Sequence, residues 1–296
     1  MNLQVQAFEE GEAAGQALAA ALGAGFGLVR THRFPDGELL PTVPAPAPAV
    51  VVYRSLDRPD DKLVELVLAC EAWRRLGARR LVLAAPYLAY MRQDRAFEPG
   101  EAISQRAIAK LLAHHLDRLV CVDPHLHRIH RLEEVFGAMP AASLSAGPCI
   151  GDWLRANGAS DVVLLGPDEE SAGLVRAVAE RLRAPWRVMA KTRHGDRSVD
   201  LGPIEADAVR DREVMLVDDI CSSGATLMAA AREALNLGAR KVRAVVVHAL
   251  FDDAVAAGLK SAGVSEINST DAVTHGTNRI RLAPMLAEAL ADEGRE

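Results

Sequence analysis

The stretch that decides the fold is VMLVDDICSSGATLMAAA, from Val214 to Ala231. An apolar run, typical of a buried strand, ends at two adjacent carboxylates, Asp218 and Asp219. Small and hydroxyl-bearing residues follow, and then an alanine- and leucine-rich stretch that predicts a helix. Strand, short loop and helix in this order form the repeating unit of parallel α/β sheets.

The chain on both sides of this stretch alternates short β-branched runs with longer helical patterns. In the first half, we expect strands at 49–53, 79–87 and 117–123 and helices at 58–77 and 104–116. In the second half, we expect strands at 160–168, 212–219 and 240–250 and helices at 169–183 and 226–238. Ser104 is the expected N-cap of its helix. This alternation predicts a mainly parallel sheet with helices on both faces in each half.

Two segments of similar sequence indicate two similarly built α/β domains. DRLVCVDPH and DREVMLVDD are both strand patterns that end in Val-Asp, about 95 residues apart. We therefore expect domains at 1–145 and 146–296, joined near 141–150. The last segment, 282–294, is expected to form a helix, and the sequence leaves open on which of the two domains it packs. The proline-rich stretch 41–50 is expected to be an exposed loop. The polar stretch 191–211 is expected to be a loop or a hairpin between two strands.

Composition excludes several classes of protein. The chain has 296 residues, half of them apolar, and a net charge of −6, which argues against general nucleic-acid binding but leaves room for a local basic pocket. The four cysteines are far apart, which favours reduced thiols over a disulfide framework. The first residues do not resemble a signal peptide, and no apolar run reaches about 18 residues. We therefore expect a soluble cytoplasmic protein with no membrane partner.

The loop after the acidic pair has the composition of a phosphate site. Ser222, Ser223, Gly224, Ala225 and Thr226 carry no long side chains, so their backbone N–H groups can approach an anion closely. The following helix presents its positive N-terminal end to the same place. Carboxylates before the loop can accept hydrogen bonds from sugar hydroxyls or meet Mg²⁺ through water. The residues predict a sugar-phosphate pocket, and a generic strand–turn–helix with an acidic cap remains the alternative.

VMLVDDICSSGAT resembles the phosphoribosyl-diphosphate-binding motif of type I phosphoribosyltransferases. RFPDGE (33–38), PYLAYMRQDRAFEPGEAIS (86–104) and VDPHLHRIH (122–130) are similar, in order and spacing, to signature segments of the ribose-phosphate pyrophosphokinases. The resemblance runs through nearly the whole chain. It implies two phosphoribosyltransferase-like domains, self-association, and transfer of a diphosphate from ATP to the C1 hydroxyl of ribose 5-phosphate. The chain contains no GxxxxGK[ST] sequence, so ATP is not expected in a P-loop.

The resemblance also assigns roles to residues, in an active site expected between the two domains. It places ATP at Phe34, Asp36, Glu38, Arg92, Gln93, Asp94, Arg95 and His125, with the first three reaching in from a neighbouring subunit. It associates Mg²⁺ with His125 and Asp168. It makes Lys191 and Arg193 the catalytic cations, and it places ribose 5-phosphate at Asp218, Asp219, Ser222, Ser223, Gly224, Ala225 and Thr226.

The sequence departs from the common family pattern at Ala225, where relatives usually carry a second glycine. This departure leaves the preferred sugar phosphate open. Two other functions also stay open. One is a phosphoribosyltransferase that consumes the diphosphate product, and the other is a non-catalytic regulatory relative of the synthase.

Overall fold

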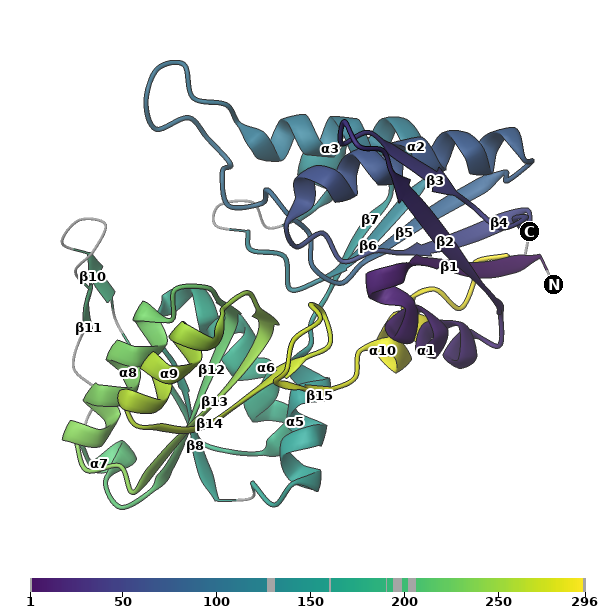
Figure 1. The fold of residues 1–296 in the computed structure, drawn as a ribbon. Helices are drawn as coiled ribbons and strands as arrows, with labels where there is room; N and C mark the ends of the chain where they lie inside the picture. Colours follow the sequence, from purple (N-terminus) through teal and green to yellow (C-terminus); the bar gives the residue numbers. More distant parts are fainter. Residues whose placement is uncertain are drawn as a thin grey trace. The chain divides into compact units, whose positions relative to one another are not determined.

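The structure is a computed structural model that describes residues 2–126, 131–159, 161–189, 191–193, 199–201 and 206–294, with the backbone alone for 191–193 and 199–201. The chain forms two compact units (Figure 1). The first unit comprises the chain up to Leu144 together with the residues from Leu282 onward, and the second comprises Ser145–Arg281. None of the helices in the described part of the chain has the length and apolar character needed to cross a bilayer.

The first unit is built on a seven-stranded sheet in the order β3-β2-β1-β4-β5-β6-β7. The strands are β1 (Leu3–Phe8), β2 (Gly25–Arg33), β3 (Leu39–Thr42), β4 (Ala49–Tyr53), β5 (Arg80–Ala85), β6 (Arg118–Val122) and β7 (Ala141–Leu144). The helical elements are η1 (Glu9–Gly11), α1 (Glu12–Leu22), α2 (Pro59–Arg75), α3 (Ser104–His115), α4 (Glu133–Phe136) and α10 (Ala283–Ala289). Among the described pairings of this sheet, β2 and β3 are antiparallel and the others are parallel.

Both faces of this sheet are covered. Figure 1 shows α2 and α3 on one face and α1 and α10 on the other. Every residue of β4 is buried, as expected for a central parallel strand between two helical layers. Alternate residues such as Val50 and Val52 pack into the core beneath α2, around the fully buried Trp73.

The second unit has a six-stranded sheet in the order β15-β14-β13-β12-β8-β9, in which all described pairings are parallel. Its strands are β8 (Val162–Gly166), β9 (Trp186–Val188), β12 (Glu213–Cys221), β13 (Lys241–Ala249), β14 (Val264–Thr270) and β15 (Asn278–Ile280). Its helical elements are α5 (Gly147–Ala156), η2 (Glu169–Ser171), α6 (Ala172–Leu182), α7 (Ala206–Val209), α8 (Ala225–Asn236) and α9 (Asp253–Ser261). A separate antiparallel hairpin joins β10 (Lys191–Arg193) to β11 (Val199–Leu201).

The structure confirms the predicted α/β class and its two mainly parallel sheets. It also confirms the hairpin alternative for 191–211 within the residues it describes there. Two details were wrong. Ser104 is the first residue of α3 and not its cap, because the N-cap position is Ile103 and no side chain caps the helix. The strand expected at 212–219 continues to Cys221, because its pairing with β13 extends that far.

The proline-rich stretch is only partly a loop. Pro41 lies in β3, which pairs on one side only, with β2. A proline lacks the N–H needed by a central strand but is tolerated at a sheet edge. The irregular connection is therefore limited to the residues between Thr42 and Ala49.

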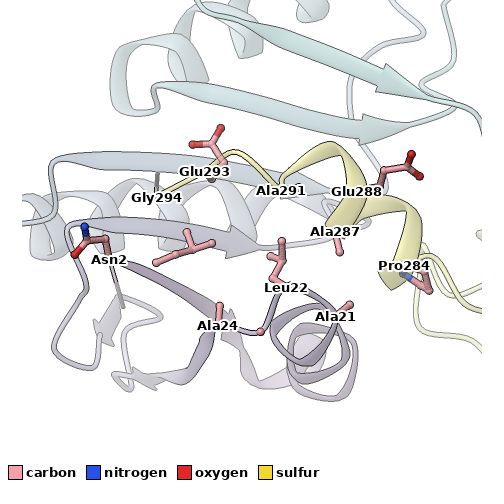
Figure 2. Close-up of a pocket in the computed structure, with 12 residues that line it drawn as sticks. Asn2, Ala21, Leu22, Ala24, Pro284, Ala287, Glu288, Ala291, Glu293 and Gly294 are labelled. Carbon is pink, nitrogen blue, oxygen red and sulfur yellow. The ribbon is translucent and has the colours of Figure 1, made fainter. Parts of the chain in front are cut away.

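The C-terminal segment belongs to the first unit, where α10 packs against α1. The carboxylate of Glu293, almost completely buried, accepts hydrogen bonds from Arg80 Nε (2.5 Å) and Arg118 Nη1 (2.7 Å). In Figure 2 this carboxylate points away from Leu22 and Ala24, which line a pocket on the other side of the segment. Glu293 thus fastens the end of the chain to the amino ends of β5 and β6.

Candidate functional site

The acidic pair lies in the middle of the second sheet. Asp218 is level with Val246 of β13 and is only 8% exposed. Its Oδ1 accepts a hydrogen bond from the backbone N–H of Asp219 at 3.0 Å. Asp168 follows the neighbouring strand β8, so it reaches the same edge of the sheet. Burial, and then the charges of Asp219 and Asp168, raise the pKa of Asp218 well above its usual value. This edge therefore favours a ligand that donates hydrogen bonds or carries positive charge.

Gly224 supplies the one left-handed conformation of the loop that follows. Its backbone has φ 70° and ψ 0°, and a Cβ there would lie 2.8 Å from Val255 Cγ1. Ala225 is the first residue of α8 and is helical. A second glycine is therefore not required by the backbone at 225, because alanine is fully compatible with a helix. The departure at Ala225 therefore adds no backbone strain to the loop.

The loop offers several free hydrogen-bond donors. Among the residues described, the backbone N–H groups of Ser222, Ser223, Gly224, Thr226 and Leu227 have no hydrogen-bond partner. Free N–H groups in the first turn of a helix, aligned with the helix dipole, are the usual protein partners of a phosphate. They surround a pocket of about 50 Å³ that Asp218 also lines. Acid, anion cradle and helix terminus thus meet at one place in the second unit.

In the first unit, the residues expected at ATP leave the sheet from two neighbouring strands. The loop with Arg92, Gln93, Asp94 and Arg95 follows β5, and His125 follows β6. Because β5 and β6 pair in parallel, both segments emerge at the same carboxyl edge, where ligands of α/β sheets collect. Within the described residues, neither Arg92 nor Arg95 makes an ion pair. Their charges are therefore available to an anion.

Phe34, Asp36 and Glu38 form a separate patch. They occupy the turn between β2 and β3, which Arg33 ties to α2 through a 2.5 Å hydrogen bond to Asp61. In the sheet order, β2 is three strands from β5, or about 14 Å at the usual strand spacing. Within one chain, the turn between β2 and β3 and the arginine loop after β5 therefore leave the sheet at different places. The predicted contribution of this turn to a neighbouring subunit's site stays a prediction.

Other predicted site residues are placed only in part. Lys191 and Arg193 lie on β10, where they pair with Leu201 and Val199. His125 belongs to the first unit and Asp168 to the second. Asp168 accepts hydrogen bonds from Glu170 N (3.2 Å) and Ser171 N (3.4 Å) and so caps η2. The end of the signature segment, His127 to His130, lies outside the described residues. Among described residues, no group of three or more His, Cys, Asp or Glu forms a preassembled metal site.

Two larger pockets lie elsewhere in the first unit. They have volumes of about 660 and 590 Å³ and flank the C-terminal segment, which includes Glu293. The larger is lined by Leu3 at the start of β1 and the smaller by the starts of β4, β5 and β6, at the amino edge of the sheet. Ligands of parallel sheets bind at the opposite, carboxyl edge. Size therefore does not identify the functional site in this molecule.

Comparisons with known proteins show the family of the whole chain. Residues 3–115 match the family model of the N-terminal domain of ribose phosphate pyrophosphokinase, and residues 150–278 match that of the phosphoribosyl transferase domain. A ribose-phosphate pyrophosphokinase from Methanopyrus kandleri is 37% identical over 97% of this chain and 98% of its own. The chain belongs to the ribose-phosphate pyrophosphokinase family. A family member from Thermococcus kodakarensis is 34% identical over 87% of this chain and 90% of its own.

A solved structure shares the pyrophosphokinase fold. The phosphoribosylpyrophosphate synthetase of Mycobacterium smegmatis superimposes with a TM-score of 0.81, covering 99% of this chain and 98% of its own, at 22% identity. The resemblance to ribose-phosphate pyrophosphokinases found in the sequence is thereby confirmed. That resemblance named the arginine loop but missed two residues that shape it, Phe97 and Glu101. The Pro99-Gly100 pair between them was the available signal, because this pair is typical of a tight turn.

Proposed function

We propose that the protein transfers the β,γ-diphosphate of Mg-ATP to the C1 hydroxyl of ribose 5-phosphate, giving 5-phosphoribosyl 1-diphosphate and AMP. The observation that carries the proposal is the set of free N–H groups after Asp218 and Asp219. This cradle suits the 5-phosphate, and the carboxylates suit the ribose hydroxyls, which donate hydrogen bonds. The family membership of the whole chain supports the same substrate.

ATP is proposed to bind at the carboxyl edge of the first unit. Arg92 and Arg95 have the planar, permanently charged groups that pair with phosphate oxygens, and no described acid neutralises them. Gln93, Asp94 and His125 belong to the same proposed site. The turn with Phe34, Asp36 and Glu38 is proposed to hold the adenine of a neighbouring subunit, so we also propose that the protein self-associates.

The proposed chemistry is a direct displacement. The C1 hydroxyl oxygen attacks the β-phosphorus, the bond from the β-phosphorus to the oxygen shared with the α-phosphate breaks, and AMP leaves with that oxygen. The hydroxyl proton passes to water, and no covalent enzyme intermediate forms. Lys191 and Arg193 are proposed to stabilise the charge that develops on the transferred group and on AMP.

The residues present fit a magnesium ion. Mg²⁺ takes oxygen ligands, usually one or two carboxylates together with substrate phosphates, so a protein cage of three acidic side chains is not needed. Asp168, Asp218 and Asp219 offer carboxylate oxygens whose mutual repulsion a divalent cation relieves. With His125, Asp168 is the proposed metal-associated residue. When bound, Mg²⁺ supplies positive charge to the phosphates. A cytoplasmic location is also proposed.

The test is to separate the nucleotides after mixing purified protein with Mg-ATP and ribose 5-phosphate. We expect AMP, formed only when the sugar phosphate is present, in equal amount to 5-phosphoribosyl 1-diphosphate. Ribose is the control substrate, because it offers the same C1 hydroxyl but no phosphate for the cradle. ADP as product indicates an ordinary kinase. ATP binding without turnover indicates a regulatory relative, and either result contradicts the proposal.

A further inference from the structure

The loop that carries Arg95 is folded by its own residues. Pro99 and Gly100 are the central residues of a tight turn, in which Gly100 has φ 93° and Glu101 N donates to Glu98 O at 3.2 Å. Proline before a glycine of positive φ is the arrangement of a type II turn. The turn brings Glu101 back towards the residues just before it.

Glu101 then holds those residues with one carboxylate oxygen. Its Oε2 accepts hydrogen bonds from Phe97 N (2.7 Å), Glu98 N (3.2 Å) and Gln93 Nε2 (3.4 Å). The bonds from Phe97 and Glu98 lower the pKa of Glu101, so it stays ionised at neutral pH. Gln93 Nε2 also donates to Arg95 O at 3.1 Å, which connects the turn to the arginine.

Phe97 is placed by this turn beside Arg95. The guanidinium carbon of Arg95 lies 4.6 Å from the centre of the Phe97 ring, within the range of a cation–π contact. Phe97 is 56% exposed, so burial in the core does not explain the position of its ring. Within the described residues no carboxylate pairs with Arg95. An aromatic ring restricts the position of a guanidinium and leaves its positive charge in place. A carboxylate partner would also restrict the guanidinium, but it would neutralise that charge.

We propose that Phe97 is a positioning residue that holds Arg95 ready for the polyphosphate of ATP, and that Glu101 keeps the turn that places Phe97. The inference rests on the proposed function, because it takes ATP as the ligand of Arg95. Stacking restricts the guanidinium before the nucleotide arrives, so less conformational entropy is lost on binding. The charge remains free for the phosphate oxygens.

The experiment measures the dissociation constants of ATP, ADP and AMP by calorimetry on the full-length protein without ribose 5-phosphate. Phe97→Leu removes the ring and keeps an apolar side chain, and Phe97→Trp keeps a ring. We expect Phe97→Leu to weaken ATP about 2- to 5-fold, the usual size of an exposed cation–π contact, with smaller effects on ADP and AMP. Phe97→Trp should bind ATP like the wild type. The KM for ribose 5-phosphate should not change.

Two further comparisons separate positioning from a general structural role. In an Arg95→Ala background, Phe97→Leu should have no additional effect on ATP, because the cation it positions is gone. Glu101→Ala should weaken ATP as Phe97→Leu does. Glu98→Ala is the matched control. It removes an acid from the same loop, and the Glu98 side chain makes no hydrogen bond or ion pair with a described residue, so ATP binding should be unchanged.

Each other result overturns the inference. Equal weakening of AMP and ATP assigns Phe97 to the nucleoside, and additive effects of Phe97→Leu and Arg95→Ala show that the two side chains act separately. Unchanged ATP binding in Phe97→Leu, or a Phe97→Trp variant as weak as Phe97→Leu, also refutes it. A wild type that binds no ATP refutes both proposals. If the nucleotide series behaves as expected but no AMP forms with ribose 5-phosphate, the proposed reaction fails and the positioning role stands.

Discussion

The two units present candidate ligand groups at the same edge of similar sheets, but with different parts of the chain. The first uses a long loop, 86–103, with exposed cationic side chains, and hydrogen bonds from Gln93 and to Glu101 hold the backbone around Arg95. The second uses the short loop after β12, in which the backbone N–H groups of Ser222, Ser223 and Gly224 have no partner and Gly224 sets the path.

The difference indicates how each site tolerates substitution. Side chains supply the charge in the first unit, so replacing a side chain or its support should change binding there. In the second unit the donors belong to the backbone, and most side chains of the loop can change without removing them. Only a change in backbone conformation, or in the carboxylates beside the loop, should have a large effect.

The largest effect is expected at Lys191, the proposed catalytic cation, because a backbone N–H cannot supply a full positive charge. Lys191→Ala should lower kcat by about 10²- to 10³-fold, the usual cost of removing a charge-stabilising group, with little change in stability. Steady-state kinetics and a thermal melt measure both. Lys260→Ala, on an exposed position of α9, is the matched control. Unchanged turnover in Lys191→Ala removes this residue from the mechanism.

A substitution at Asp218 tests the role of the carboxylates beside the loop of the second unit. Asp218→Asn should weaken the binding of ribose 5-phosphate about 10- to 100-fold, because a hydrogen bond to a charged group usually contributes a free energy of this size. The same variant should have a higher Tm without ligand at pH 7. A carboxyl whose pKa is raised on folding destabilises the folded state above its unfolded-state pKa, near 3.9, and asparagine removes that cost. A lower Tm than wild type at pH 7 contradicts this account.

Adjacent substitutions in the loop separate backbone from side chain. Gly224→Ala places a Cβ 2.8 Å from Val255 Cγ1 and strains a positive φ, so the loop must shift. We expect ribose 5-phosphate to bind about 10-fold more weakly, since a left-handed alanine costs 1–2 kcal/mol. Ala225→Gly, in the first turn of α8, should change binding less than about 2-fold. Similar effects of both substitutions would show that position 225, not the conformation of Gly224, controls the site.

The smallest effect on ligand binding is expected at the opposite edge of the first unit. Glu293→Gln should destabilise the protein by roughly 2 kcal/mol at pH 7, because two arginines lose their charged acceptor. Burial alone raises the pKa of Glu293, but the hydrogen bonds and charges of Arg80 and Arg118 outweigh it and lower the pKa overall. The stabilisation is therefore full above the unfolded-state pKa, about 4.3, and is lost as the pH falls through the lower folded value.

Denaturant unfolding at pH 7 and at about pH 3 measures this pH dependence. The difference between wild type and Glu293→Gln should shrink at the acidic pH. Glu288→Gln is the control, since Glu288 is exposed on the same segment and its side chain contacts no described cation. Equal losses of stability in both variants would contradict a specific role for Glu293.

The strands that were predicted best are those whose burial is uniform. All five residues of 49–53 are apolar and buried, so the pattern gave both ends of β4 correctly. In contrast, β14 has the polar sequence VSEINST and was not predicted. Its buried hydroxyls are satisfied by tertiary hydrogen bonds, such as Thr270 Oγ1 to Val247 O at 2.7 Å, which no local pattern contains. For the same reason, the end of β12 at Cys221 depends on β13 and not on its own residues.

The candidate site was predictable where short motifs carry the chemistry. Asp218 and the small loop after it line one pocket in the structure, as their closeness in sequence implied. Sequence did not show that Gly224 alone takes the left-handed conformation, so Ala225 appeared more consequential than its helical backbone makes it. The role of Glu101 depends on a turn that reverses the chain, and the support it gives appears only in three dimensions.

The position of α10 has a consequence for how the chain is made. The first unit takes its last helix from residues beyond Leu282, which are synthesised after the whole of the second unit. Until they leave the ribosome, α1 lacks its helical neighbour, and Arg80 and Arg118 lack the carboxylate of Glu293. During translation, the second unit therefore has all its residues before the first unit can close, although the first unit begins earlier.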